Sequence, residues 1–312
     1  MGSKDPPGPR RVSAPLLVQQ ARRWSRDDTV RTWAGLAPAL AVVGVLFGGA
    51  VWSALSRSLG VGAIGTAGPS LAAYRRLFAD PEFWPSVALT AHVAVTSTLL
   101  SVVLGVGAAL LLRRVRVGRQ SLTTLFQFNL PIPHVIGAVA ILLLLGQSGF
   151  VSRLTTSVGW TAAPADFPAL LYDPYAVGVI VQYVWKEVPF VGIVALAILR
   201  AAGDDLEVAA ATLGASAWQR FRFVTLPVLL PGVLSTAIIV FAFAFGTFEV
   251  PLLLGASYPA VLPVLVHQRY TDVDLASRPE AMALAVVVTA IVVVVVLVGV
   301  ALARRAVRRA GA

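Results

Sequence analysis

The segment that decides the fold of this chain is residues 203–227, which read GDDLEVAAATLGASAWQRFRFVTLP. It interrupts two strongly apolar stretches and carries small and apolar residues at the spacing of one helical face, namely Leu206, Ala209, Ala210 and Leu213. Gly214 is suited to end such a helix, because glycine adopts the left-handed conformation at little cost. We therefore predict a short helix between two membrane-crossing segments, with a face that another protein can approach closely.

The flanks of this helix carry further signals. Asp204, with Glu207 three residues later, forms an acidic variant of the capping box that starts helices. Residues 215–224 predict a second short helix, in which Trp218 lies among arginines and phenylalanines, a composition typical of the membrane interface. Pro227 then precedes the next apolar segment.

Composition places the chain in a membrane. Of its 312 residues, 57% are hydrophobic and only 13% are charged, which leaves too little charge to cover a soluble surface. The net charge of +10 does not indicate nucleic acid, because the arginines form short clusters beside apolar runs and no continuous basic face. The absence of cysteine excludes a disulfide framework.

Six segments are long and apolar enough to cross a bilayer as helices, which takes roughly 20 residues. We predict them at residues 34–55, 86–112, 125–145, 176–199, 229–254 and 281–303. The predicted fold class is therefore an all-α polytopic membrane protein with six transmembrane helices. The third span is the least regular, with Pro131 and Pro133 near its start. A broken helix there must have its free carbonyls buried in protein or turned to a cavity.

The lysine and arginine counts of the loops orient the spans, because cytoplasmic loops carry the excess. Of the 25 lysines and arginines, 18 lie in the N-terminal tail, at residues 113–119 and 200–222, and at the C-terminus. Both termini and the 203–227 segment are therefore predicted to be cytoplasmic. Residues 1–33 are predicted to be a tail, disordered at its proline-rich start and too long for a cleavable signal, and residues 34–312 a single six-span domain.

Residues 203–227 resemble the cytoplasmic EAA loop of permease subunits in binding-protein-dependent ABC importers of the type I fold. That loop reads Glu-Ala-Ala, three residues, Gly, nine residues, Ile or Val, one residue, Leu-Pro. The positions that match in register are Ala209, Ala210, Gly214, Val224, Leu226 and Pro227. The family's glutamate does not match, because Val208 stands at its position. Glu207 lies one residue earlier, about 100° round the helix.

The resemblance extends over most of the chain from Ser86 onward and implies an assembly of several subunits. This chain and a second permease, identical or paralogous, would form the pathway for a small polar solute by alternating access. An extracytoplasmic binding protein would deliver the solute, and two cytoplasmic ATPases would grip the coupling loop at the bacterial inner membrane. The resemblance implies these coupling residues: Asp205, Leu206, Glu207, Val208, Ala209, Ala210, Leu213, Gly214, Leu226 and Pro227.

The chain has no phosphate-binding loop of its own. Such a loop ends in Gly-Lys followed by Ser or Thr, whereas Lys186 is followed by Glu187 and Lys4 by Asp5. We therefore expect ATP and magnesium on the partner ATPases and no cofactor on this chain. We also expect neither a catalytic residue nor a metal site in it.

Charged residues inside membrane spans are costly, so they are candidates for function. Lys186 and Glu187 fall near the middle of the fourth span, and Glu249 falls towards the outer end of the fifth. With their aromatic neighbours, they give this candidate substrate pathway: Tyr183, Trp185, Lys186, Glu187, Phe248 and Glu249. His134, beside the prolines of the third span, is interpreted as a hydrogen-bonded interior histidine.

The segment around residues 248–255 looks more like the permeases for polyamines, iron(III), sulfate, thiamine or phosphonates than like those for sugars. One buried lysine against two glutamates favours a cationic solute.

Two other classes of protein compete with this interpretation. A stand-alone secondary transporter or channel would explain the spans and buried charges, but it leaves the 203–227 helix without a role. A rhomboid-type intramembrane serine protease would match the Gly-x-Ser-Gly pattern at Ser148. That enzyme needs a histidine base in its sixth span, and this chain has histidines only at 92, 134 and 267.

Overall fold

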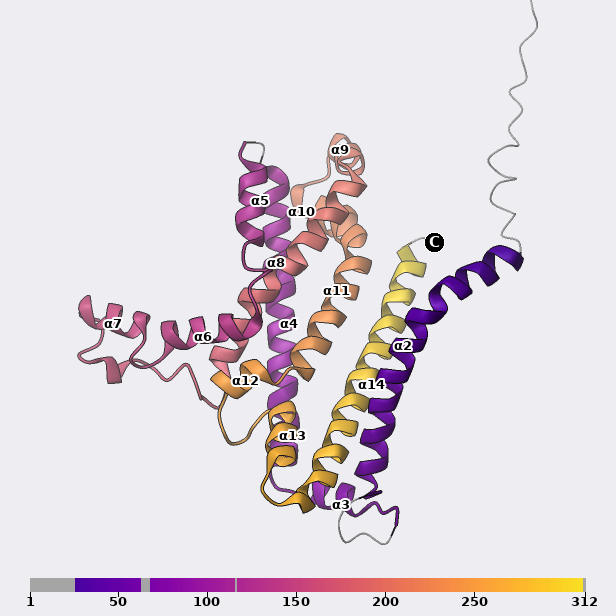
Figure 1. Cartoon of the computed structure of the whole chain (residues 1–312). Coiled ribbons are helices and arrows are strands. Elements are labelled where there is room, and N and C mark those ends of the chain that lie inside the picture. Colours follow the sequence, from indigo (N-terminus) through magenta and orange to yellow (C-terminus); the bar gives the residue numbers. More distant parts are fainter. Residues whose placement is uncertain (1–25, 63–67, 116, 311–312) are drawn as a thin grey trace, which may run out of the picture. The chain divides into compact units, whose positions relative to one another are not determined.

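The computed structural model describes residues 26–62, 68–115 and 117–310, and within these ranges it is helical and contains no strand (Figure 1). Most of the predicted tail, residues 1–25, lies outside the described residues. The helices are α2 (Arg26–Ser58), α3 (Ala72–Ala79), α4 (Phe83–Arg114), α5 (Arg119–Gln127), α6 (His134–Leu145), α7 (Phe150–Ser157), α8 (Val177–Ala202), α9 (Asp205–Thr212), α10 (Ala217–Arg220), α11 (Leu226–Gly246), α12 (Glu249–Leu254), α13 (Leu262–Thr271) and α14 (Arg278–Ala310). Three short turns of 3-10 or π-helix complete them, η1 (Pro164–Asp166), η2 (Phe221–Thr225) and η3 (Leu275–Ser277).

Six helical segments in the described ranges are long and apolar enough to cross a membrane. They are Val30–Ser58, Phe83–Arg114, His134–Ser157, Val177–Ala202, Ala217–Gly246 and Leu275–Arg305. The predicted fold class, an all-α polytopic membrane protein with six spans, is therefore confirmed. The cytoplasmic placement of the two termini stays a prediction.

The chain divides into two compact units, Met1–Ser53 and Ala54–Ala312. The described part of the first unit is the greater part of α2, an apolar helix with Pro38 inside it. The second unit contains all the other helices and the buried core.

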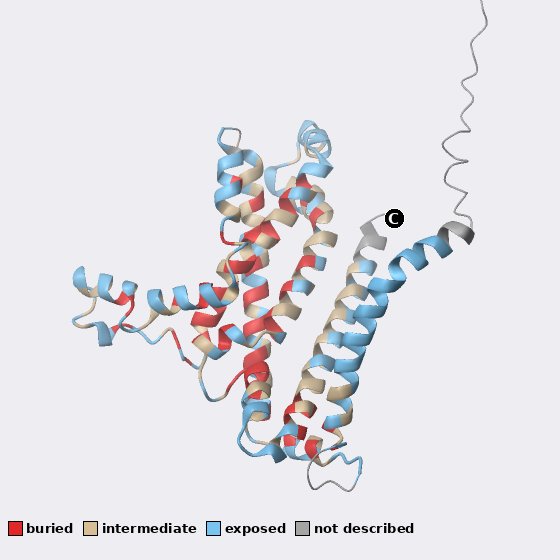
Figure 2. Cartoon of the chain, viewed as in Figure 1, coloured by how far each residue is buried: buried red, intermediate tan, exposed pale blue. Residues whose placement is uncertain are grey.

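The helices with the most extensive mutual contact in the described part of the second unit are α4 and α8, and Figure 2 shows buried residues concentrated along both. Two glycines explain the approach. A Cβ atom on Gly105 would lie 2.8 Å from the Cβ atom of Val191 and 2.9 Å from the carbonyl oxygen of Val188. A Cβ atom on Gly192 would lie 3.2 Å from the carbonyl oxygen of Gly105. Small residues allow this spacing, as is common where helices meet in membranes.

The third span differs from the prediction. Residues 125–145 do not form one helix, because α5 ends at Gln127 and α6 begins only at His134. Pro131 and Pro133 break the helix, since proline has no N–H to donate and disfavours helical geometry in the residue before it. The segment that can cross the membrane therefore lies later in the chain, where α7 follows α6.

The fifth span also differs. Its helix begins at Ala217, passes through the π-helical η2 and ends at Gly246. The second helix predicted over residues 215–224 is therefore present from Ala217, but it continues into the fifth span and is not a separate helix. Ser216 fixes the start: its Oγ accepts a hydrogen bond from the Gln219 N–H (3.3 Å), and its own N–H donates to Gln219 Oε1 (2.7 Å). Thr247 is extended, which ends the span before α12.

Helices α3 and α13 lie at the end of the second unit opposite α9 (Figure 1). Ion pairs stabilise this end. Arg269 of α13 pairs with Asp80 and lies 3.4 Å from a carboxylate oxygen of Glu280. Arg76 of α3 pairs with the same Glu280. This network joins α3, α13 and the start of α14.

The close contact at Gly105 predicts that alanine substitutions at two glycines of α4 have different effects on stability. Gly105→Ala should lower the free energy of unfolding by about 1–3 kcal/mol, because the new methyl group overpacks the contact with α8. Gly107→Ala is the matched control, since a Cβ atom there would meet nothing within 4 Å. It should be neutral or slightly stabilising. Thermal unfolding in detergent, followed by tryptophan fluorescence, measures both, and equal melting temperatures would contradict the close packing.

Candidate functional site

The short helix α9 lies between the fourth and fifth spans, at the same end of the second unit as the last turn of α4 (Figure 1). Gly203 and Gly214 bound it with φ values of 70° and 84°, a conformation that favours glycine. The predicted helix and its left-handed Gly214 are confirmed. No residue of α9 is buried, so packing contributes little to its position.

One face of α9 presents apolar side chains to the exterior. Leu206 is 60% exposed and Leu213 is 88% exposed, with Ala209 between them on the same face. Both leucines lie outside the membrane-crossing segments. Exposed apolar residues on a short helix outside the membrane-crossing segments are typical of a surface that binds another protein.

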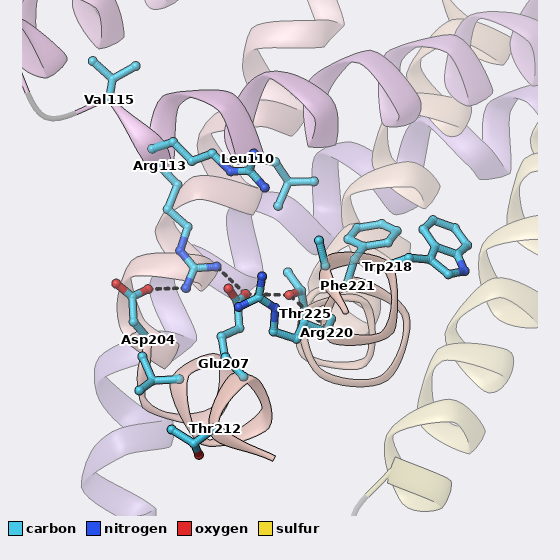
Figure 3. A pocket seen from close by; sticks show the side chains of 14 residues that line it. Leu110, Arg113, Val115, Asp204, Glu207, Thr212, Trp218, Arg220, Phe221 and Thr225 are labelled. Carbon is cyan, nitrogen blue, oxygen red and sulfur yellow. Dashed lines mark hydrogen bonds and ion pairs between the residues drawn. The ribbon is translucent and has the colours of Figure 1, made fainter. Parts of the chain in front are cut away.

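The other face of α9 is attached to two neighbouring elements by what we call the Arg113 clamp, formed by Arg113, Asp204, Glu207 and Thr225 (Figure 3). Arg113, in the last turn of α4, pairs with Asp204 and places its Nη1 atom 2.6 Å from Glu207 Oε1. The hydroxyl of Thr225, in η2, donates to the same Oε1 atom at 2.6 Å. The clamp therefore joins α4, α9 and the helix of the fifth span.

The clamp overturns the prediction that Asp204 and Glu207 form a capping box. The Asp204 side chain makes no capping hydrogen bond to the helix, and Glu207 turns to Arg113 and Thr225. A charged guanidinium is a stronger partner for a carboxylate than a backbone N–H, which explains the outcome.

The clamp also keeps Glu207 ionised. Partial burial works to raise the pKa of Glu207, but the hydrogen bonds from Thr225 and Arg113, together with the Arg113 charge, outweigh it. The pKa of this carboxyl group therefore lies below its ordinary value, and the group is charged at neutral pH.

A cavity of about 1220 Å³ opens beside the clamp (Figure 3). Its walls come from the end of α4, from α9 and from the start of the fifth span, and they include Val208, Trp218 and Arg220. Val208 is 58% exposed and, like Glu207, lines the cavity. The position where the family has its glutamate is thus at the rim of this cavity.

Lys186, a candidate residue of the substrate pathway, forms its hydrogen bonds with backbone carbonyl groups. Its amino group donates to the carbonyl oxygens of Asn129 (2.5 Å), Leu130 (2.8 Å) and Ile132 (2.5 Å), all in the break between α5 and α6. Asn129 donates in return to the carbonyl oxygen of Trp185 at 2.6 Å. Lys186 is only 5% exposed. It therefore supplies the hydrogen bonds that the broken third span lacks.

The remaining polar residues of α8 gather around His134. Its Nε2 atom lies 3.5 Å from Glu187 Oε1, and Gln182 donates to its carbonyl oxygen at 3.2 Å. Its ring lies 4.6 Å from that of Phe243, which also contacts Tyr183 edge-on at 6.1 Å. His134 is half-buried and within hydrogen-bond reach of Glu187, which agrees with its interpretation as a bonded interior histidine. Tyr183 is fully buried among these helices.

The other two pathway candidates lie at the start of α12, which contacts α8. Phe248 stacks on His267 with ring centroids 5.2 Å apart. Glu249 is exposed at the start of α12, beyond the end of the fifth span, and within the described ranges no ion pair joins it to Lys186 or to another residue. The structure thus brings together the pathway residues of α8 but does not join Glu249 to them by an ion pair.

The protease alternative gains no support. Ser148 is exposed between α6 and α7, and no hydrogen bond to a histidine is present at Ser148 in the part of the chain that the structure describes. The same part of the chain contains no cluster of His, Cys, Asp or Glu that could hold a metal ion.

Sequence reasoning missed two members of the clamp. Arg113 served only as a positive charge that orients the spans, and Thr225 had no assigned role. Arg113 lies 94 residues from Glu207, so no local pattern could pair them. An arginine in the last turn of an otherwise apolar helix was the one available signal.

Lys186 should therefore matter for stability more than for contact with substrate. Lys186→Met keeps the apolar stem but removes the lysine donor from the carbonyl oxygens of Leu130 and Ile132, and leaves that of Asn129 only the N–H of Ile132. This should lower the free energy of unfolding by at least about 2 kcal/mol. Glu187→Gln, at the adjacent position, should have a smaller effect because its contact to His134 is long. Melting temperatures in detergent compare the two variants. A Lys186→Met protein that melts like the parent but has lost uptake would instead place Lys186 in the pathway.

Comparisons with known proteins agree with this architecture. Residues 101–311 match the family model for the binding-protein-dependent transport system inner membrane component. The molybdenum transport system permease protein ModB of Mycobacterium tuberculosis is 36% identical over 206 residues, which cover 64% of this chain and 74% of that protein. The trehalose transport system permease protein SugA of the same species is 29% identical over 222 residues, covering 70% and 69%.

A solved structure shares the fold. It is a bacterial alginate ABC transporter in complex with an alginate pentasaccharide-bound periplasmic protein, and one of its chains matches with a TM-score of 0.72 at 21% identity, over 93% of this chain and 97% of that one. The family match covers more than half of the residues, including α9, the clamp, four whole spans and the last part of the second span. The chain therefore belongs to the family of binding-protein-dependent transport system inner membrane components and is a permease subunit of an ABC importer.

Proposed function

We propose that this chain and a second permease, identical or paralogous, form the translocation pathway of an ATP-driven importer for a small polar solute in a bacterial inner membrane. An extracytoplasmic binding protein delivers the solute to the outer loops, among them residues 257–280. The pathway opens alternately to the two sides of the membrane as two cytoplasmic ATPases close and open. ATP and magnesium bind to those ATPases, and both termini of this chain lie in the cytoplasm.

The observation that carries this proposal is the exposed apolar face of α9. Leu206 lies on α9 and Leu213 directly follows its last residue, both outside the spans, and the helix has no buried residue of its own. The helix is nevertheless fixed in place by the Arg113 clamp. A helix that is firmly attached on one side and open and apolar on the other is suited to receive force from a partner. We assign the ATPase-docking role to this face.

For the solute, the relatives favour a tetrahedral oxyanion of the molybdate or sulfate kind. The molybdenum permease is more similar to this chain than the trehalose permease, at 36% against 29% identity. The count of buried charges, which favoured a cation, loses weight because the Lys186 amino group is taken up by three backbone carbonyls.

The docking role predicts that a charge on the apolar face of α9 releases the ATPase. Leu213→Asp should weaken capture of the cognate ATPase in detergent by at least about tenfold, equivalent to roughly 1.4 kcal/mol. Val273→Asp is the matched control, because Val273 is 97% exposed in a loop at the opposite end of the second unit. It should capture the ATPase as the parent does.

Two results would contradict this role. Undiminished capture by the Leu213→Asp protein would move the docking surface away from α9. Uptake into proteoliposomes that contain this chain alone would make it a secondary transporter.

The oxyanion proposal predicts selective uptake by the complete transporter. Cells that express this chain with its partner subunits should accumulate labelled molybdate or sulfate at a rate well above cells that lack the ATPase. Spermidine and trehalose should not accumulate above that control. Uptake of trehalose alone would overturn the choice of solute while leaving the importer function intact.

A further inference from the structure

Glu207 occupies a central position that the family pattern does not explain. The family places a glutamate at the next residue, where this chain has Val208. One possibility is that Glu207 takes over the missing contact to the ATPase. The structure argues against this, because the carboxylate of Glu207 is already occupied within the chain.

The carboxylate of Glu207 has two specific hydrogen-bond donors. A single oxygen, Glu207 Oε1, accepts from Arg113 at 2.6 Å and from Thr225 at 2.6 Å. Thr225 is 5% exposed and the Arg113 side chain 16% exposed, so both donors are largely removed from solvent. Withdrawing Glu207 towards a partner protein would leave the guanidinium of Arg113 with only the exposed Asp204 and the carbonyl oxygen of Gly203 as acceptors. It would leave the buried hydroxyl of Thr225 with only a 3.4 Å contact to the carbonyl oxygen of Arg220, so the withdrawal is costly.

Few contacts other than those of Glu207 attach α9 to the membrane-crossing helices. α9 has no buried residue and is bounded by glycines at 203 and 214, both with positive φ. Asp204 also pairs with Arg113, but its side chain is 74% exposed, and exposed pairs contribute little. The most protected link between α9 and the spans is therefore the one through Glu207.

We propose that Arg113, Glu207 and Thr225 act as positioning residues that transmit movement of α9 to the ends of α4 and of the fifth-span helix, and that Glu207 does not replace the family glutamate in contacting the ATPase. The inference rests on the proposed docking role of α9. It assigns the two faces of α9 different tasks: the leucine face meets the ATPase, and the Glu207 face carries the displacement to two spans at once.

The test compares coupling with docking in the complete transporter reconstituted into proteoliposomes. Thr225→Val keeps the shape of the side chain and removes the hydroxyl that donates to Glu207. It should raise the number of ATP molecules hydrolysed per solute transported by roughly three- to tenfold, since losing one element of a coupling network weakens coupling by such factors. Glu207→Gln should change the ratio in the same direction. Both variants should capture the ATPase within about twofold of the parent affinity, a tolerance well below one decade of binding.

Two further variants act as controls. Thr225→Ser restores a hydroxyl and should return the ratio to the parental value. Thr212→Val makes the same substitution on α9 itself, at a hydroxyl that lines the same cavity but donates to the carbonyl of Ala209 and not to the clamp. Its ratio should equal that of the parent.

The outcomes separate the two proposals. Loss of ATPase capture in Glu207→Gln would show that Glu207 docks the ATPase and would overturn the inference. A fall of uptake and hydrolysis by the same factor, with an unchanged ratio, would reduce the clamp to a stabilising contact and would also overturn it. Failure of the unaltered chain to capture the ATPase would instead refute the docking role on which both proposals rest.

Discussion

The structure depends on a single constraint, which is that backbone groups inside a membrane protein must find hydrogen-bond partners without water. Two prolines break the third span and free several carbonyl oxygens, and the amino group of Lys186 binds three of them. Burying an ammonium group is costly, but three charge-assisted hydrogen bonds offset much of that cost. The lysine thereby fastens the break to α8, the helix against which α4, α6 and α11 all pack.

The α8 helix is built for close contact on one side and polar contact on the other. Gly192 meets Gly105 of α4, so two backbones approach within the reach of a single methyl group. Gln182, Lys186 and Glu187 face the region of the broken span. In membranes, small residues and buried hydrogen bonds take the place of the hydrophobic effect in joining helices, and α8 uses both.

Outside the membrane the means of attachment changes. The helix α9 contributes no buried residue, and charges and one hydroxyl hold it in place. An attachment of this kind fixes the direction of the helix without burying its surface, so the leucine face stays open. The arrangement suits an element that must bind a partner and still move with it. Glu207 belongs to this attachment: although it is next to the position of the family glutamate, its carboxylate binds Arg113 and Thr225 of its own chain.

The sequence by itself determined the membrane class, the number of spans, the short helix at 203–214 and the irregularity near Pro131, because apolar length, proline and glycine act locally on the backbone. The register of the family pattern was likewise readable from the spacing of Ala209, Ala210 and Gly214. Only the tertiary structure decided that Lys186 binds backbone carbonyls and that Glu207 meets Arg113 and Thr225, and it moved the capping box from Asp204 to Ser216. The partners of these charged residues lie 18 to 94 residues away, and a charged side chain takes whichever strong partner the packing of helices brings within reach.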